Sequence, residues 1–367
     1  MKLKRLNLLS GKFDWLFLLA ICLLVILGLA LLYSIAVGSQ SDANLLNFKK
    51  QIVFFVIGLL VSLVIAFIID YRVLLKYSYV FYGILLIILA IVLFYGNTIR
   101  GTTGWFKLGF LSFQPAEFAK IALLIFLGKY FSDRAKYIGQ IKYLILSSLG
   151  VIAYVILVVL QPDFGSALIL IAIWAGLILL TGIKKSHLLL LILLVFVAST
   201  VLWLFVFQDY QKQRIEVFLN PAADPLGSGY NITQAIIAIG SGGFFGKGLG
   251  FGSQSQLKFL PESQTDFIFA VLAEELGFIG IVMFLALISF VFFRLWQGAK
   301  RVNDNFALYM IIGVMILFFV QMVINIGGNL GLLPITGITL PFVSYGGSSL
   351  LANFILVGII ESIYIHS

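Results

Sequence analysis

The sequence has few of the charged residues that a water-soluble protein needs. Only 11% of its 367 residues are charged and 62% are hydrophobic, whereas soluble domains are about a quarter charged and about half apolar. This composition excludes a water-soluble globular protein. With 35 phenylalanines and only seven prolines, the chain is not disordered either.

Cysteine and histidine are also scarce. The single cysteine, Cys22, excludes an internal disulfide, and redox chemistry is not expected. The two histidines, His187 and His366, lie far apart in the sequence, so a histidine metal site is not expected either.

Long apolar runs are abundant. A helix that crosses a bilayer needs about 20 apolar residues, and ten runs of this kind follow one another. They are Trp15–Val37, Ile52–Ile69, Tyr79–Tyr95, Phe118–Phe131, Tyr143–Leu160, Phe164–Ile183, Leu188–Phe207, Phe267–Phe293, Phe306–Ile326 and Gly347–Ile365. The fourth run is short and contains Lys120, so we expect it to be buried among other helices. The sequence therefore predicts an all-α polytopic integral membrane protein with about ten transmembrane helices.

Lysine and arginine are distributed unequally between the two sides of these spans. Fifteen fall on the side of the N-terminal segment and eight on the opposite side, and Lys120 lies within a span. The eight are Lys49, Lys50, Arg100, Lys107, Lys212, Arg214, Lys247 and Lys258. The positive-inside rule then predicts that both termini are cytoplasmic. This bias explains the net charge of +9, so no nucleic-acid partner is expected.

One loop on the opposite side is unusually long. Residues 208–265 connect the seventh and eighth spans and are rich in glycine between Gly240 and Gly252. Loops of this length are usually functional. We find no internal repeat, low-complexity tract or linker, so residues 1–367 are expected to form a single membrane domain that includes this extracytoplasmic loop.

Ionisable side chains at the outer ends of the spans need an explanation, because one at mid-helix costs about 2.5–3.5 kcal/mol on insertion scales. Glu117 and Lys120 are three residues apart and share a helix face. Mutual neutralisation would account for this pair. Asp163 precedes a span, where an acid interacts favourably with free helical N–H groups. Asp266 ends a Ser263-Gln264-Thr265-Asp266 capping-box pattern, so helix capping would account for it.

These four residues nevertheless fall on the same side as the long loop, which favours a shared polar site facing outward. A carboxylate near low-dielectric walls can serve as a general base, and cations can hold a diphosphate. Glu274 is about 80° around a helix from Asp266, so it could line a related cavity at greater depth. Glu275 is about 180° from Asp266 and should pack against another helix.

Several segments resemble the SEDS family (shape, elongation, division and sporulation), which includes RodA and FtsW. The segments lie in the same order as in the family and cover nearly the whole chain. They are Trp105, Gln114–Glu117 with Lys120, Gln161–Gly165, Ala238–Gly243, Phe259–Gly277 and Asn325–Ser349.

The resemblance implies a peptidoglycan glycosyltransferase that polymerises lipid II, releases undecaprenyl diphosphate and works with a class B penicillin-binding protein in the bacterial cytoplasmic membrane. It implies that Asp266 is the catalytic base, that Lys120 binds the diphosphate and that Glu117 and Asp163 position substrate. Trp105 would stack on sugar or support its loop. A divalent cation, Mg²⁺ or Mn²⁺, would neutralise the diphosphate, although the three acids form no recognisable metal-binding motif.

Within the family, Ile335-Thr336-Gly337 and the lack of long tails favour the elongation (RodA-like) branch over the division (FtsW-like) branch. Two other functions use the same features. A lipid II flippase needs a polar path through the full depth of the membrane, whereas a base at the outer mouth suits polymerisation. A membrane scaffold that only recruits a transpeptidase would not need Asp266 at all.

Overall fold

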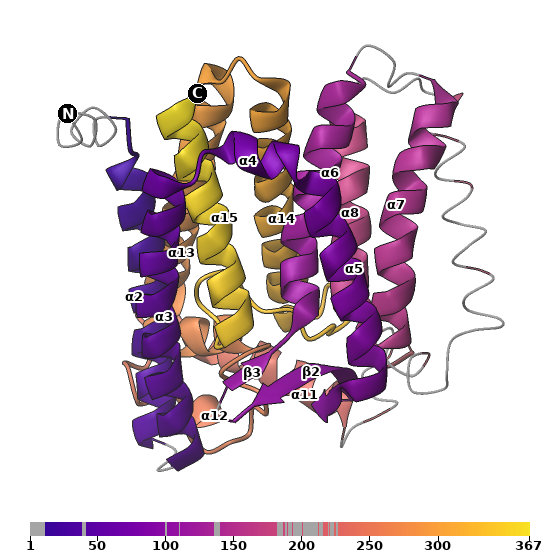
Figure 1. Cartoon of the computed structure of the whole chain (residues 1–367). Coiled ribbons are helices and arrows are strands. Elements are labelled where there is room, and N and C mark those ends of the chain that lie inside the picture. Colours follow the sequence, from indigo (N-terminus) through magenta and orange to yellow (C-terminus); the bar gives the residue numbers. More distant parts are fainter. Residues whose placement is uncertain are drawn as a thin grey trace.

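Long helices that run between two opposite faces dominate the computed structural model of the chain (Figure 1). The structure describes residues 12–38, 42–99, 101–109, 111–135, 140–181 and 227–367, with scattered positions between 182 and 226. Among these residues, seven helices are long and apolar enough to cross a membrane. They are α2 (Trp15–Gly38), α3 (Asp42–Ile68), α5 (Ser78–Tyr95), α7 (Ile141–Leu160), α13 (Ile268–Arg301), α14 (Asn305–Asn329) and α15 (Gly347–His366).

Two further helices, α6 (Pro115–Asp133) and α8 (Phe164–Leu180), complete the described part of the bundle. Lys120 of α6 is only 2% exposed, so this helix is buried among its neighbours, as its charge predicted. Nine of the ten predicted spans thus coincide with described helices. The seventh, Leu188–Phe207, lies almost entirely outside the described residues, so the total of ten remains a prediction.

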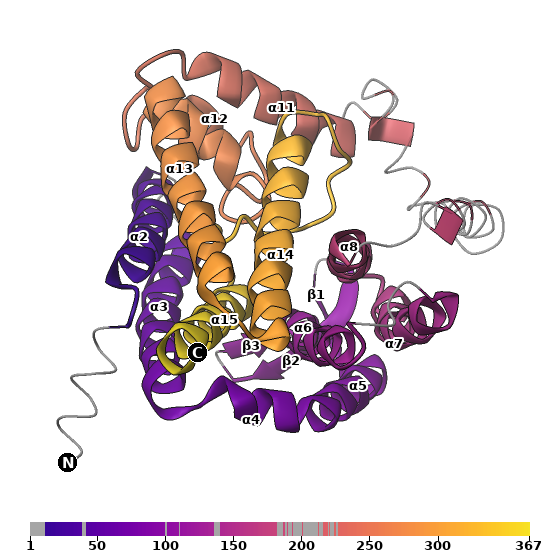
Figure 2. The same cartoon turned by 90° about the horizontal axis from the view of Figure 1, so that it is seen from above.

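The last helix, α15, occupies the middle of the bundle, between α3, α6 and α14 (Figure 2). Its apolar window is 83% buried, although its hydropathy is the lowest of the seven candidate spans. A Cβ atom on Gly358 would lie 2.8 Å from the main-chain oxygen of Ser62, so glycine allows α15 and α3 to pack with their backbones in close approach.

Helix α3 begins earlier than its apolar run. It starts at Asp42 rather than near Ile52, so its first ten residues form a polar helical extension that includes Lys49 and Lys50. The sequence had placed both lysines in a loop. A search for apolar runs misses such an extension because polar residues can also be helical.

One end of the bundle contains elements that the sequence did not predict. The segment after α5 folds into a three-stranded antiparallel sheet, formed by β1 (Asn97–Ile99), β2 (Thr102–Leu108) and β3 (Leu111–Phe113). The described part of the long loop contains α11 (Ser228–Ser241) and the short helix α12 (Ser253–Gln256). These elements lie at one end of the bundle, while the start of α2, the short helix α4 (Tyr71–Lys76) and the end of α15 lie at the other (Figure 1).

Helix α13 is interrupted at Gly277, whose φ of 63° and ψ of −160° are not helical. The interruption frees backbone groups on both sides, and the glycine-rich segment after α11 binds them. Gly248 N donates to Glu275 O over 2.9 Å, and Phe278 N donates to Gly243 O over 3.0 Å. Buried backbone groups need such partners, so the interruption and the glycine-rich segment form one structural unit.

Candidate active site

The structure brings the five predicted site residues around one cavity of about 510 Å³ at the end of the bundle that carries the sheet. Glu117 and Lys120 come from the start of α6 and Trp105 from β2. Asp163 precedes α8, and Asp266 precedes α13. These residues are up to 161 positions apart in the sequence, so only the packing of the helix ends brings them together.

Glu117 and Lys120 form the expected ion pair. Lys120 Nζ lies 2.7 Å from Glu117 Oε1, and the two side chains are 3% and 10% exposed, respectively. Pro115 at the start of α6 favours helix formation there and sets the orientation of this first turn. The pair is therefore largely removed from water but still lines the cavity.

Asp163 caps α8, as its position predicted. Its Oδ1 accepts a hydrogen bond from Ser166 N over 3.0 Å, and its Oδ2 accepts one from Ser166 Oγ over 2.8 Å. Gln114 Nε2 also donates to Oδ2 over 3.0 Å and so connects the starts of α6 and α8. Burial raises the pKa of Asp163, and the hydrogen bonds from Ser166 and the charge of Lys120 oppose this rise.

Asp266 does not form the capping box that its local pattern predicted. Helix α13 starts at Ile268, its N-cap is Phe267, and no side chain caps it. Instead, the main-chain oxygen of Asp266 accepts hydrogen bonds from Asn325 Nδ2 over 3.1 Å and from Asn329 Nδ2 over 2.8 Å. Both asparagines belong to α14, so this neighbouring helix holds the turn that carries Asp266.

Two glycines let the loop between α14 and α15 approach the acids. Gly337 has a φ of +75°, and a Cβ atom there would lie 4.0 Å from Asp266 Oδ2. A Cβ atom on Gly165 would lie 2.6 Å from the main-chain oxygen of Thr336. The first turn of α8 therefore packs directly against the loop that borders Asp266, which places Asp163 and Asp266 on walls of the same cavity.

The cavity includes polar residues that the sequence analysis did not select. Lys50 lines it from the polar extension of α3, which the search for apolar runs had missed. Glu262, Asn231 and Tyr345 line it from segments taken as loops. Glu262, Tyr345, Ser348 and Ser349 belong to segments quoted for the family resemblance, and that resemblance was the one available signal for them.

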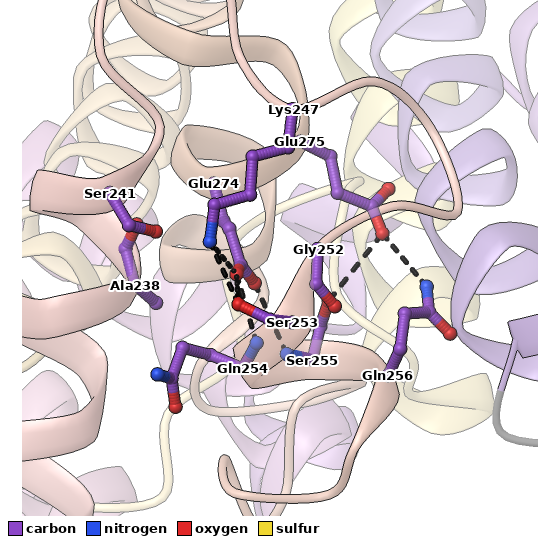
Figure 3. A network of polar contacts seen from close by, with 10 residues as sticks. All are labelled: Ala238, Ser241, Lys247, Gly252, Ser253, Gln254, Ser255, Gln256, Glu274 and Glu275. Atoms are coloured by element: carbon purple, nitrogen blue, oxygen red, sulfur yellow. Dashed lines mark hydrogen bonds and ion pairs between the residues drawn. The ribbon is translucent and has the colours of Figure 1, made fainter.

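Glu274 is not at the predicted place. It does not line the cavity, and its side chain is fully buried in a network with the glycine-rich segment (Figure 3). Lys247 Nζ lies 3.0 Å from Glu274 Oε1, and Gln254 N and Ser255 N also donate to this carboxylate. The prediction assumed one continuous helix from Asp266 onward, but Asp266 lies in a turn outside α13.

Glu275 packs against another helix, as predicted. Ser34 Oγ of α2 donates to its carboxylate over 2.6 Å, and Gln256 Nε2 donates over 3.0 Å (Figure 3 shows the contact with Gln256). Glu274 and Glu275 together hold the segment around α12 against α13 and α2. Their role in this structure is to hold a loop in place.

The described residues do not fit a metal site built by the protein alone. Within them, no group of three or more histidine, cysteine, aspartate or glutamate side chains lies close enough to hold a metal ion. Glu117 is already paired with Lys120, and Asp163 accepts hydrogen bonds from Ser166 and Gln114.

The fold and this site define a multi-pass membrane protein with a polar, charged cavity at one end of its helix bundle. Residues 14–367 match the model of the cell cycle protein family of FtsW, RodA and SpoVE, and the chain belongs to this family. The family resemblance of the sequence is thereby confirmed.

Curated proteins and solved structures agree with this assignment. The chain is 38% identical over 345 residues to the peptidoglycan glycosyltransferase MrdB of Escherichia coli K12. This match covers 94% of the chain and 92% of MrdB. It matches the crystal structure of RodA from Thermus thermophilus with a TM-score of 0.71 and 30% identity, over 96% of each chain. A chain of a peptidoglycan synthase complex that coordinates polymerization and crosslinking matches with a TM-score of 0.80 and 31% identity, over 96% of this chain and 97% of that one.

Proposed function

We propose that this protein is a peptidoglycan glycosyltransferase that polymerises lipid II during cell elongation. One observation carries the proposal: a carboxylate, Asp266, and two ammonium groups, Lys50 and Lys120, line the same cavity at the helix ends of a chain of this family. Polymerisation needs both kinds of group, because a sugar hydroxyl must lose a proton and a diphosphate must leave.

In the proposed reaction, Asp266 removes the proton from the C4 hydroxyl of the acceptor GlcNAc. The resulting oxygen attacks C1 of the MurNAc at the end of the growing strand and forms the new glycosidic bond. The bond between C1 and the diphosphate oxygen breaks, and its electron pair leaves with undecaprenyl diphosphate. A general base typically contributes about 10²–10⁴-fold to the rate.

Lys120 and Lys50 are the proposed partners of the diphosphate, where negative charge develops as the bond breaks. Lys120 comes paired with Glu117, so its remaining N–H donors are the ones proposed to face the substrate. Glu117 and Asp163 would position Lys120 and the start of α8, and Trp105 would stack on sugar or support the sheet. A divalent cation is proposed only as a partner of the substrate's diphosphate, and no step depends on it.

We further propose that the site opens outward from the bacterial cytoplasmic membrane, with both termini in the cytoplasm. The bias of lysine and arginine toward the opposite face supports this orientation. A class B penicillin-binding protein is the proposed partner, because a solved structure similar to this chain is part of a complex that combines polymerization with crosslinking.

The test is polymerisation of labelled lipid II by the purified protein with its cognate transpeptidase, with Asp266→Asn compared with the wild type. This substitution keeps the size of the side chain and leaves the main-chain oxygen that Asn325 and Asn329 bind. We expect a loss of about 10²–10⁴-fold in rate. Equal strand formation by a folded variant would contradict the role of Asp266.

A flippase, a division polymerase and a membrane scaffold are the alternatives. If neither the wild type nor Asp266→Asn made glycan strands while binding to the transpeptidase stayed intact, a translocation assay with labelled lipid II would become the decisive measurement. Rescue of a cell-division mutant, rather than of a cell-shape mutant, would move the protein to the division branch. A scaffold role predicts that Asp266→Asn leaves both strand formation and cell shape unchanged.

A further inference from the structure

A second cavity, of about 570 Å³, is lined by the start of α2 and the ends of α13 and α15. These helix ends lie at the end of the bundle opposite the sheet (Figure 1). Three basic side chains line it, Lys12, Arg294 and Arg301. Asp14 provides the one acidic side chain of the lining within the described part of the chain, and the carboxylate of the last residue, Ser367, also lines the cavity. Nothing in the proposed glycosyl transfer uses this cavity.

One wall of the cavity is held in place by buried polar contacts. Asp14 Oδ2 lies 2.8 Å from Arg294 Nε and 2.7 Å from Arg294 Nη2, and these two side chains are 10% and 19% exposed. Asp14 N donates to Glu361 Oε2 over 2.9 Å, and Glu361 is only 1% exposed. The acidic side chain of the lining is therefore neutralised by its own partner.

The other two cations, Lys12 and Arg301, lie on the rim of the cavity and have N–H donors that no other group in the described part of the chain uses. Lys12 Nζ donates to the main-chain oxygen of Ser367 over 3.1 Å, and two of its protons remain available. Arg301 is exposed and has no hydrogen bond or ion pair within the described residues. Asp14 and Arg294 cancel, and the carboxylate of the last residue, Ser367, offsets the charge of Lys12. Arg301 therefore gives the cavity an excess of positive charge that favours an anion.

The surroundings of the cavity are apolar and aromatic. Trp15 and Leu16 line it and are 56% and 53% exposed, on the side of α2 that faces away from the bundle. Tryptophan at the end of a membrane-spanning helix lies at the level of the lipid headgroups. A ligand here would meet two cations on one side and a lipid-facing aromatic surface on the other, a combination that suits an amphiphile with an anionic head.

We propose that this cavity binds an anionic phosphate, which in the membrane is the phosphate of a phospholipid headgroup. Lys12 and Arg301 hold the phosphate oxygens, and Trp15 and Leu16 contact the glycerol and the first part of the acyl chains. Basic pockets between transmembrane helices are known to hold anionic headgroups by this chemistry.

The test is saturation binding to the purified full chain in neutral detergent, followed by native mass spectrometry. The probes are dioctanoyl phosphatidylglycerol, dioctanoyl phosphatidylcholine and inorganic phosphate. The double variant Lys12→Gln/Arg301→Gln removes both rim cations. Its matched control, Arg72→Gln/Lys300→Gln, also removes one lysine and one arginine, but neither of these residues lines the cavity.

We expect phosphatidylglycerol to bind saturably and more tightly than either other probe. The rim variant should weaken this binding at least about tenfold, while the control keeps it. All four substituted residues are exposed, so matching size-exclusion profiles should show that both variants fold.

Three results would overturn the proposal. Equal weakening by the rim variant and the control would mean that only diffuse charge attracts the lipid. Unchanged binding by the rim variant would place the lipid elsewhere. Inorganic phosphate that binds as tightly as phosphatidylglycerol, with the same loss in the rim variant, would assign the cavity to a free phosphate compound instead of a lipid.

Discussion

At the scale of single residues, the acids of the cavity differ in the ion pairs and hydrogen bonds that hold them in place. Glu117 is paired with a buried lysine, and Asp163 accepts hydrogen bonds from Ser166 and Gln114. Asp266 is held through its main-chain oxygen, to which two asparagines of α14 donate. The structure thus fixes the backbone of the turn that carries Asp266 through a neighbouring helix.

The buried pair of Glu117 and Lys120 gives a prediction that separates stability from activity. Glu117→Gln leaves a lysine that is 2% exposed without its counter-charge, and removing one partner of a buried pair costs about 3–5 kcal/mol. We expect a clearly lower unfolding temperature in detergent. The double variant Glu117→Gln/Lys120→Met should recover that stability and still fail to make glycan strands.

A double variant with restored stability and full activity would assign the pair to assembly alone. This outcome is the alternative that the spacing of the two residues left open. Lys120→Met alone provides the comparison, because it leaves Glu117 without its partner.

At the scale of elements, α14 positions the turn that carries Asp266. Asn329→Leu removes the 2.8 Å hydrogen bond to the Asp266 oxygen and also the acceptor for Ala270 N. We expect kcat for polymerisation to fall at least about tenfold with little change in KM, because the reacting group moves and the binding groups stay.

Gln321→Leu is the matched control for this prediction. Gln321 lies on the same helix, two turns before Asn329, and is also 1% exposed. Equal losses of kcat in the two variants would show that α14 only needs its polar core residues for folding.

The interrupted helix α13 gives a second prediction at this scale. A Cβ atom on Gly277 would lie 2.2 Å from Gly246 N, and its φ of +63° is strained for any other residue. We expect Gly277→Ala to lower the unfolding temperature, since the glycine-rich segment must move away. Gly240→Ala is the control, because nothing lies within 4 Å of its Cβ position and it is helical in α11. An unchanged unfolding temperature for Gly277→Ala would contradict the close packing.

At the scale of the whole molecule, the two cavities lie at opposite ends of the bundle, one at the sheet and one at the ends of α13 and α15. The proposed orientation places them on opposite sides of the membrane. It is tested with single cysteines in a Cys22→Ser background, at Lys107 in β2 and at Asn303 after α13. Both positions are exposed.

A membrane-impermeant maleimide should label Lys107→Cys in intact cells and Asn303→Cys only after permeabilisation. The reverse pattern would invert the proposed topology and place the candidate active site in the cytoplasm. Equal labelling of both positions in intact cells would mean that the reagent crosses the membrane, and a bulkier reagent would then be required.

The sequence alone determined the class of protein and most of the helices. Apolar runs report burial in lipid or protein directly, because every span must satisfy its backbone internally and cover it with apolar side chains. The same reasoning identified α6 as buried from Lys120 alone, and it identified Asp163 as a helix cap. The family motifs supplied Asp266, since local spacing favoured a capping box that the structure does not form.

Only the tertiary structure decided how the helix ends meet. Lys50 joins the cavity because α3 extends beyond its apolar run, and no hydropathy pattern marks a polar extension. Glu274 leaves the cavity because α13 starts after Asp266, so the angle calculated along one continuous helix does not apply. Both outcomes depend on contacts between segments far apart in the chain, such as those of Asn325 and Asn329 with Asp266. Local sequence patterns do not predict such contacts.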